Sequence, residues 1–293
     1  MNIKVEVKNM AQGLKGTFGL AIKNMVTGEE ILWNEDEGFP FASVVKVNLL
    51  VELFRQVDEG KIRLDDKLIM SELIKAPGSG ILQLLTPGLE MSVKDTSSLM
   101  MLISDNTATD MIFNRIGKNN VIRTMQELGL KRTIIRTTIR DLLFDLVGLK
   151  DIDPKKRTVD LYNEMTKPEK LVDLKREKPL DIDNYTTPRD MMVLLEKIYK
   201  GEAASKNSCN EIVELMKKCH TGGNRIIKYL PKDDVKVAHK TGSLRGVVND
   251  VGIVFPKEGE PYTICCFVKE LSDSSDGEDI IANISKLAYT YFS

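Results

Sequence analysis

The stretch Phe41-Ala42-Ser43-Val44-Val45-Lys46-Val47-Asn48-Leu49-Leu50 begins an apolar run that continues to Phe54. Such a density of apolar side chains is typical of a helix buried on all sides. Ser43 would lie in the first turn, where free backbone N–H groups favour an anion. Lys46 follows three residues later, so its amine shares a helix face with the Ser43 hydroxyl. A buried lysine is a candidate base for activating that serine, because burial lowers the pKa of an amine.

The spacing Ser-x-x-Lys has a second interpretation. At roughly 5% usage per residue type, about one such match is expected by chance in a chain this long. Ser43 could simply cap the helix, and Lys46 could extend its amine to solvent. The stretch therefore predicts a buried helix but not, by itself, a nucleophile.

Composition limits the class of protein and its partners. With 293 residues and 42% apolar content, the chain can bury a full core in one large or two smaller domains. A formal charge of −1 gives no reason to expect nucleic acid or an anionic membrane as partner. The sequence has no apolar run long enough to span a membrane and does not begin with a signal-like stretch. We expect a cytoplasmic monomer that acts on a small molecule; a secreted or periplasmic protein whose leader has been removed is the alternative.

The four cysteines are Cys209, Cys219, Cys265 and Cys266. Their spacing fits neither a disulfide framework nor a paired CxxC motif, so we expect no zinc site, and we expect no cofactor. Cys265 and Cys266 are adjacent in an expected strand. They should therefore point to opposite faces as small buried hydrophobes.

Short apolar segments near both ends of the chain, with helical patterns between them, predict a mixed fold. Residues 16–23 and 31–33 alternate as a β-hairpin does. Further strands are expected at 235–240, 247–255 and 262–268, and helices at 92–103, 105–116, 121–128, 188–199, 209–219 and from 278 onward. The expected fold class is α/β (α+β): an antiparallel sheet built from both ends of the chain and flanked by the terminal helices, plus an inserted all-helical domain. The expected boundaries are 1–41 and 205–293 for the sheet domain and 42–204 for the helical domain.

A charged excursion occupies residues 150–184. From Lys150 to Asp183, 18 of 34 residues are charged, and the stretch contains three prolines. Such a composition favours a solvated and mobile segment, in which short helices are compatible with the pattern.

Two more motifs follow Ser43 in the sequence. They are Ser104-Asp105-Asn106 and Lys240-Thr241-Gly242-Ser243. Each triplet alone would arise by chance in about one chain in ten to thirty, as a helix-capping turn or the polar end of an edge strand. All three motifs in this order have a joint chance on the order of one in a few hundred or less.

Ser-x-x-Lys, Ser-Asp-Asn and Lys-Thr-Gly together resemble class A β-lactamases and penicillin-binding proteins. The flanking sequences, Asn249-Asp250-Val251-Gly252 and Thr186-Thr187-Pro188 are similar to that family too. The resemblance covers nearly the whole chain, except roughly residues 137–184. It implies a hydrolase whose nucleophile lies between a sheet domain and a helical domain.

The resemblance also implies a role for each motif residue. Ser43 would be the acylated nucleophile, with Lys46 balancing its proton, and Ser104 would pass a proton to the leaving nitrogen. Asn106 would bind the substrate's side-chain amide. Lys240 would hold Ser104 and supply positive potential. The substrate-binding residues of the third motif would be Thr241, Gly242 and Ser243, and Thr241 and Ser243 would meet the substrate carboxylate.

The resemblance also implies an oxyanion hole, and two basic residues near the third motif need an interpretation. The backbone N–H groups of Ser43 and Ser243 would form an oxyanion hole, worth roughly 3 kcal/mol per donor. Arg245 could add charge for the carboxylate, or be a plain surface arginine. His239 is expected to be a packed strand residue rather than a catalyst.

One departure from the family concerns the second half of the reaction. Class A β-lactamases carry a Glu-x-x-Leu-Asn motif whose glutamate activates the deacylating water. The stretch expected there is Thr137-Thr138-Ile139-Arg140-Asp141-Leu142-Leu143, which holds no glutamate. Glu169 lies 19 residues before Pro188, close to the family's spacing, but within the charged excursion. A solvated loop glutamate is the default interpretation of Glu169, and a deacylation base is the alternative.

The sequence therefore predicts a serine hydrolase that forms a Ser43 acyl-enzyme, with β-lactam hydrolysis as the first hypothesis. A peptidase or esterase of the same fold with weak β-lactam turnover is the second, and the missing glutamate favours it. A penicillin-binding or sensing module that stays acylated is the third. Ser43, Lys46, Ser104 and Lys240 are the expected catalytic residues.

Overall fold

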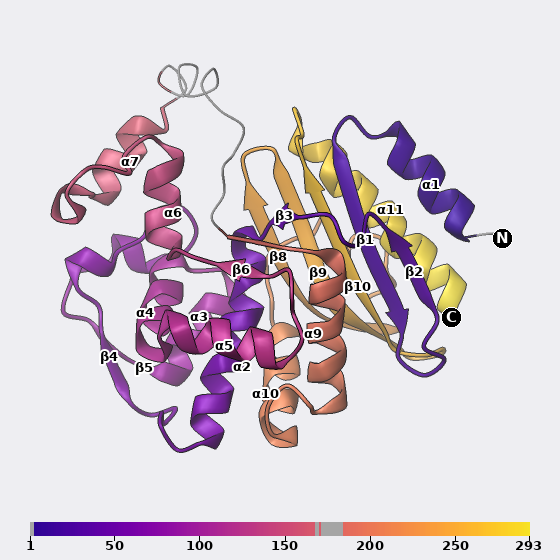
Figure 1. Cartoon of the computed structure of the whole chain (residues 1–293), viewed down its shortest axis with the longest axis horizontal. Coiled ribbons are helices and arrows are strands. Elements are labelled where there is room, and N and C mark those ends of the chain that lie inside the picture. Colours follow the sequence, from indigo (N-terminus) through magenta and orange to yellow (C-terminus); the bar gives the residue numbers. More distant parts are fainter. Residues whose placement is uncertain (1–2, 168–169, 171–183) are drawn as a thin grey trace.

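A five-stranded antiparallel sheet forms one half of the molecule (Figure 1). The structure, a computed structural model, describes residues 3–167, 170 and 184–293. In spatial order the strands are β2 (Glu30–Trp33), β1 (Thr17–Asn24), β10 (Tyr262–Lys269), β9 (Val247–Pro256) and β8 (Val235–Leu244). β1 pairs with β10, so the two ends of the chain meet in one sheet, as predicted. β8 is an edge strand of this sheet.

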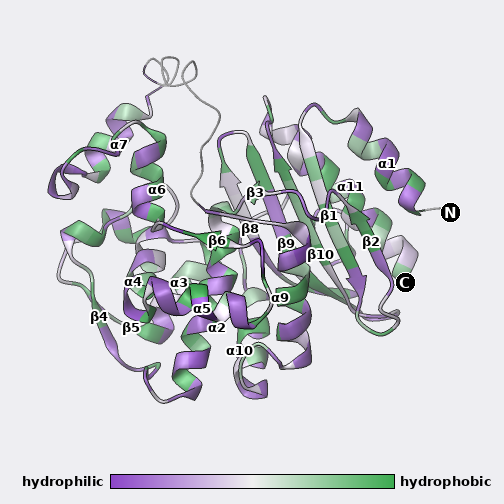
Figure 2. Cartoon of the chain, in the orientation of Figure 1, coloured by the Kyte–Doolittle hydropathy of each residue, from purple (hydrophilic) through white to green (hydrophobic). Residues whose placement is uncertain are grey.

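Helices cover both faces of the sheet. α1 (Ile3–Gly13) and α11 (Ser274–Phe292) cover one face, and α9 (Pro188–Lys200) and α10 (Lys206–Met216) cover the other (Figure 1). Hydrophobic residues run along the central strands between these layers (Figure 2). Cys266 packs with the α1 and α11 side chains, whereas Cys265 packs with the opposite core. The predicted opposite orientation of these two cysteines is confirmed.

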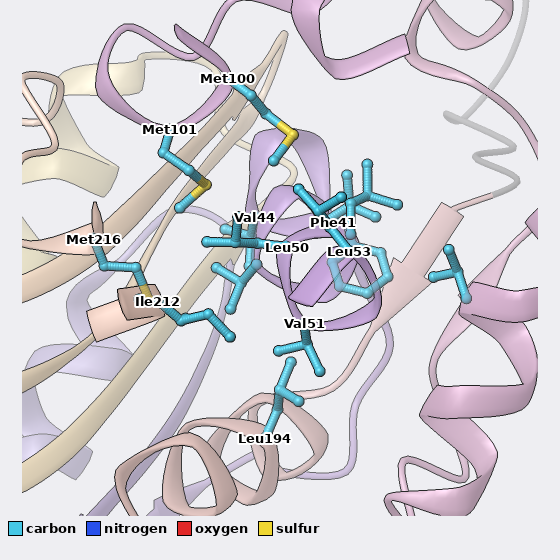
Figure 3. Close-up of a cluster of buried hydrophobic side chains, with 14 of the residues drawn as sticks. Phe41, Val44, Leu50, Val51, Leu53, Met100, Met101, Leu194, Ile212 and Met216 are labelled. Atoms are coloured by element: carbon cyan, nitrogen blue, oxygen red, sulfur yellow. The ribbon is translucent and has the colours of Figure 1, made fainter. Parts of the chain in front are cut away.

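Helix α2 (Val45–Asp58) is the centre of the helical half. It contacts α3 (Val93–Leu102), α4 (Asn106–Ile116), α5 (Lys118–Glu127) and α10. Figure 3 shows methionines of α3 and apolar side chains of α9 and α10 packed around Val44, Leu50, Val51 and Leu53. The apolar run from Phe41 thus forms a helix buried on all sides, as its composition predicted.

The start of this helix differs from the prediction. Ser43 lies not in the first α-helical turn but in a 3-10 turn, η1 (Ala42–Val44), and the residue at the N-cap position of α2 is Val44. Ser43 therefore does not cap α2. Lys46 is fully buried rather than extended to solvent. Both observations remove the alternative interpretation of the Ser-x-x-Lys spacing.

Capping side chains set the ends of several helices. Ser92 accepts a hydrogen bond from Asp95 N at the start of α3, and Thr187 caps α9 just before Pro188, as predicted. Three starts were predicted too late. α5 begins at Lys118, three residues before the predicted Val121. α10 begins at Lys206 because Ser205 caps it, and α11 begins at Ser274 because Asp273 caps it.

Short elements connect the two halves and complete the helical part. A three-stranded sheet contains β3 (Phe39–Pro40), β7 (Asn184–Thr186) and β6 (Ile134–Ile135), and a two-stranded sheet contains β4 (Lys67–Ile69) and β5 (Glu90–Ser92). The short helices are η2 (Glu72–Ile74), η3 (Leu82–Leu84), α6 (Ile139–Leu146), η4 (Pro154–Lys156) and α7 (Val159–Met165). η4 and α7 are short helices within the charged excursion.

Side chains of the excursion pack against a small separate core, made by Phe144, Val147 and Leu149 just before it. Glu169 lies outside the described residues, and the mobility of the excursion stays a prediction. The domain boundary at residue 204 also stays a prediction; α10, which follows it, contacts both α2 and β8. Within the described ranges, no helix has the length and apolar character needed to cross a membrane.

Candidate active site

The turn that carries Ser43 is held in place by β8 and β9. Ala42 has a φ of +48°, a conformation that non-glycine residues rarely adopt and that often marks a functional site. A Cβ atom at Gly242 of β8 would lie 2.7 Å from the Phe41 carbonyl oxygen, so only glycine lets the strand approach this closely. Asn249 Nδ2 of β9 also donates to the Phe41 oxygen, at 3.2 Å. Ser43 is thus presented on a rigid and strained turn.

Lys46 is buried one helical turn beyond Ser43. Its Nζ donates to Ser104 O at 2.7 Å, Asn106 Oδ1 at 2.9 Å and Ser104 Oγ at 2.8 Å. Burial, reinforced by the charge of Lys240, holds the pKa of Lys46 well below its usual range. With the amine neutral, its two N–H groups serve Ser104 O and Asn106 Oδ1, and the Ser104 hydroxyl donates to its lone pair instead of accepting.

No hydrogen bond joins Lys46 to Ser43 within the part of the chain that the structure describes. A direct transfer of the Ser43 proton to Lys46 therefore stays a prediction.

Ser104 lies between the two buried lysines. Lys240 Nζ donates to Ser104 Oγ at 3.1 Å and to Thr241 O at 3.0 Å, so this hydroxyl contacts both amines. Burial lowers the pKa of Lys240 as well. Ser104 has a φ of +58°, the second left-handed non-glycine residue of the site. This backbone conformation lets its carbonyl and hydroxyl oxygens both face Lys46.

Asp105 and Asn106 fix the Ser104 turn. Asp105 Oδ2 accepts from the backbone N–H groups of Ile81 (2.7 Å) and Leu82 (2.9 Å) and caps α4 with its other oxygen. Asn106 Nδ2 donates to Pro77 O at 2.8 Å, and its Oδ1 accepts a hydrogen bond from Lys46 Nζ. Both ends of the Asn106 amide are engaged inside the protein, so its contact with a substrate stays a prediction.

A cleft of about 200 Å³ opens between this turn and the edge strand β8. Its lining is mostly polar and consists of Ser43, Ser79, Ser104, Thr221, Gly222, Gly223, Asn224, Arg225, Thr241, Ser243 and Glu278. Four of the predicted site residues are in this lining. Of the others, Lys46, Asn106 and Lys240 lie buried behind Ser104, and Gly242 lies against the Ser43 turn. The structure thus brings all eight predicted residues together.

Arg225 is the main residue of the cleft that the sequence analysis missed. It lies between α10 and β8, and its Nη2 donates to Ser243 Oγ at 2.7 Å. Beside it, the hydroxyls of Thr221 and Thr241 are 2.5 Å apart. Arg225 belongs to no motif, so only the preceding Gly222-Gly223 turn could have hinted at it. Arg245, the predicted alternative, lies exposed in the β8–β9 turn and not in the cleft lining.

His239 is a packed strand residue, as expected. It is 2% exposed on β8, and its Nδ1 lies 3.0 Å from Asp250 Oδ1 on β9. Burial opposes the charged imidazolium, but the carboxylate of Asp250 outweighs it and raises the pKa of His239. The pair contributes to the sheet beneath the cleft rather than to the cleft lining.

The stretch that replaces the family's glutamate motif forms the start of α6. Asp141, its acidic residue, points to Arg157, with Oδ1 and Nη1 2.9 Å apart. Ile139 is buried and borders, with Val45 and Asp110, a cavity of only about 10 Å³. Asp110 on α4 accepts from the backbone N–H groups of Ile139 (2.9 Å) and Arg140 (2.8 Å). This stretch therefore brings an apolar side chain, and no glutamate, to the side of α2.

Asp110 should make the protein less stable as the pH rises from about 4 to about 7. Burial raises its pKa from 3.8 to about 7; the hydrogen bonds from Arg140 and Ile139 and the charge of Lys46 oppose the shift, while Asp141 adds to it. In this window the folded state keeps a proton that the unfolded state has lost, so the free energy of unfolding falls with rising pH.

Urea unfolding of the wild type and Asp110→Asn at pH 5 and pH 8 checks this. The loss of stability between the two pH values should be smaller in Asp110→Asn than in the wild type, and unchanged in the control Asp279→Asn, whose carboxylate is exposed. An equal pH dependence in all three proteins would contradict the assignment.

Comparison with known proteins agrees with the motifs and their geometry. The sequence model of the β-lactamase enzyme family matches residues 2–292. The extended-spectrum β-lactamase PER-1 of Pseudomonas aeruginosa is 26% identical over 301 residues, which cover 99% of this chain and 87% of that protein. The crystal structure of a β-lactamase from Sphaerobacter thermophilus DSM 20745 matches with a TM-score of 0.81 at 28% identity, covering 98% of this chain and 96% of that one.

A second similar structure bears the name of a penicillin-binding protein. It is a variant of PBP-A, solved as an acyl-enzyme complex with penicillin G, with a TM-score of 0.81, 28% identity and coverage of 99% of this chain and 96% of the other. These matches extend over nearly the full length of the sequence and include both the sheet and the helical half. The chain belongs to the β-lactamase enzyme family.

Proposed function

We propose that this protein hydrolyses β-lactams through an acyl-enzyme on Ser43. The observation that carries the proposal is the Ser104 hydroxyl held between two fully buried lysines, beside a serine on a strained turn. Burial lowers the pKa of both lysines, and that of Lys46 lies well below its usual range, which favours the neutral amine that can act as a base.

Acylation begins when Ser43 Oγ attacks the carbonyl carbon of the lactam. Its proton passes to neutral Lys46, and the negative charge that forms on the carbonyl oxygen is received by the backbone N–H groups of Ser43 and Ser243. The close approach of β8 to the Ser43 turn at Gly242 supports this pairing of donors.

The C–N bond then breaks, and the leaving nitrogen needs a proton. Ser104 donates its hydroxyl proton to that nitrogen and takes a replacement from Lys46, which is now an ammonium. The contact of Ser104 Oγ with both Lys46 and Lys240 supports this relay, since Lys240 stabilises the hydroxyl while its proton is in transit. Lys46 ends the step neutral again, so protons balance.

Hydrolysis of the acyl-enzyme is the less well-equipped step. Glu278 is the acidic side chain among the described residues that line the cleft, and it is paired with Arg225. The buried Ile139 at the start of α6 favours a second candidate function. This is a penicillin-binding enzyme whose acyl-enzyme forms quickly and is hydrolysed slowly. A peptidase or esterase of this fold would share the same first step.

Turnover of a chromogenic cephalosporin, measured together with the mass of the protein, separates these functions. Many turnovers per enzyme, with a transient adduct on Ser43, are expected for a β-lactamase. A stable adduct without further turnover would favour the penicillin-binding candidate. If neither product nor adduct forms, the proposed function is wrong, and peptide and ester substrates become the next to test.

A further inference from the structure

The segment of residues 75–79, between η2 and η3, contributes Ser79 to the lining of the cleft. The segment is neither helix nor strand, so its position depends on hydrogen bonds from its neighbours. Asn106 supplies two of them. Its Nδ2 donates to Pro77 O at 2.8 Å, and its backbone N–H donates to Ser79 O at 3.0 Å. A shift of this segment would therefore also shift the Asn106 amide.

Arg140 holds the start of the same segment. Its Nε donates to Lys75 O at 3.2 Å. Its Nη2 donates to Pro154 O at 2.9 Å and to Arg157 O at 2.6 Å, both in the charged excursion. The guanidinium lies 5.0 Å from the centre of the Phe144 ring, and the side chain is only 8% exposed. One buried guanidinium thus joins the excursion to a wall of the cleft.

The backbone of Arg140 is fixed as well. Its N–H donates to Asp110 Oδ2 on α4 at 2.8 Å, and Asp110 is itself buried. The planar fork of an arginine presents its donors in a rigid arrangement, which no other side chain reproduces. The distance between α4 and the Lys75 carbonyl is therefore set by Arg140, and Pro77 follows Lys75 by two residues.

We propose that Arg140 is a positioning residue, which aligns the Asn106 amide for a substrate by fixing the start of the segment 75–79. Arg140 is not in the lining of the cleft, so it acts through the Lys75 carbonyl and not by contact with the substrate. The inference rests on the proposed function, because Asn106 is the residue expected to bind the amide of a substrate's side chain.

Arg140→Met tests this link, because methionine keeps an unbranched apolar stem but has no N–H donors. Arg157→Met is the matched control. The side chain of Arg157 is 9% exposed, and its donors reach the excursion and Asp141 of α6. Within the described residues it makes no hydrogen bond to the segment 75–79. The probes are penicillin G, whose side chain carries an amide, and 6-aminopenicillanic acid, which has the same rings without that amide.

The measured quantity is the second-order rate constant of acylation, followed by intact-protein mass spectrometry. We expect Arg140→Met to lower it about tenfold for penicillin G and no more than about twofold for 6-aminopenicillanic acid, since a misplacement of about 1 Å costs up to about 10²-fold. Arg157→Met should react with both probes as the wild type does. Arg140→Lys, which keeps the charge and one donor group, should recover part of the loss.

Thermal unfolding shows whether each variant is folded. If Arg140→Met does not fold, Arg140→Lys and Arg157→Lys are compared in its place, and only Arg140→Lys should lose acylation by penicillin G, by about threefold, because an amine does not replace the planar fork.

Three results would overturn the inference. An equal loss with both probes in a folded Arg140 variant would make the role of Arg140 purely structural. Equal losses in the Arg140 and Arg157 variants would assign the effect to the excursion and not to the link with the cleft wall. Unchanged acylation in the Arg140 variants would show that the segment 75–79 keeps its position without Arg140. Failure of the wild type to be acylated by either probe would instead refute the proposed function.

Discussion

Replacing Ser43 with alanine should abolish covalent labelling by a penicillin or a fluorophosphonate probe. Ser43 is the hydroxyl that the η1 turn presents to the cleft, with β8 packed against that turn. The wild type should gain the mass of one adduct, and Ser43→Ala none, in intact-protein mass spectrometry. An adduct of equal yield on Ser43→Ala would show that another residue is the nucleophile.

The two buried lysines should matter almost as much for this labelling. Lys46→Ala and Lys240→Ala should each slow it by at least ~10²-fold, the usual size of a general acid–base contribution. Lys236→Ala is the matched control, because Lys236 lies on β8 with Lys240 but is exposed. Lys46 and Lys240 both contact Ser104 Oγ, whereas Lys236 is exposed to solvent, so the control should label at the wild-type rate.

Hydrolysis of the acyl-enzyme should limit turnover. The groups for the first step are assembled around Ser43. In the stretch from Thr137 to Leu143, where the family's glutamate motif was expected, Ile139 is buried and apolar and Asp141 is paired with Arg157. A positioned general base contributes about 10²–10⁴-fold to a rate, or roughly 3–5 kcal/mol of barrier. A stopped-flow trace with a chromogenic cephalosporin should therefore show a burst of about one equivalent and then a slow steady phase.

Fast linear turnover without a burst would mean that another base serves the second step. Glu169→Gln then tests the charged excursion. If that variant is acylated normally but no longer turns over, Glu169 is the base. If it behaves as the wild type, Asp110→Asn is the next variant to compare, since Asp110 is a buried carboxyl whose charge acts on Lys46.

The parts of the fold and site that the sequence predicted are those with local signals. Strand alternation, capping residues and the Ser-x-x-Lys spacing all operate over a few residues. They located the sheet, α2 and all the motif residues. Capping also explains the late predictions for α10 and α11, because Ser205 and Asp273 gave weaker signals than the apolar patterns that follow them.

The unpredicted residues owe their roles to contacts between distant parts of the chain. Arg225 is held by a hydrogen bond to Glu278, which is 53 residues away. Asp110 is held by backbone N–H groups of α6, which are 29 and 30 residues away. Neither lies in a motif, and nothing in the neighbouring residues distinguishes them from surface charges. The buried position of an acidic or basic side chain is visible only once the fold brings its partners together.

The pairing of β1 with β10 has a consequence for how this protein is made. Thr17 is opposite Lys269, so 252 residues separate the two partners in sequence. A ribosome that adds about 5–20 residues per second needs roughly 12–50 s to cover that distance. Throughout that time β1 has no β10 to pair with, and for most of it Ser43 has been made without Lys240. The nascent hairpin thus exposes an unpaired apolar edge that a chaperone could shield, and the enzyme can become active only after the last strand of its sheet is synthesised.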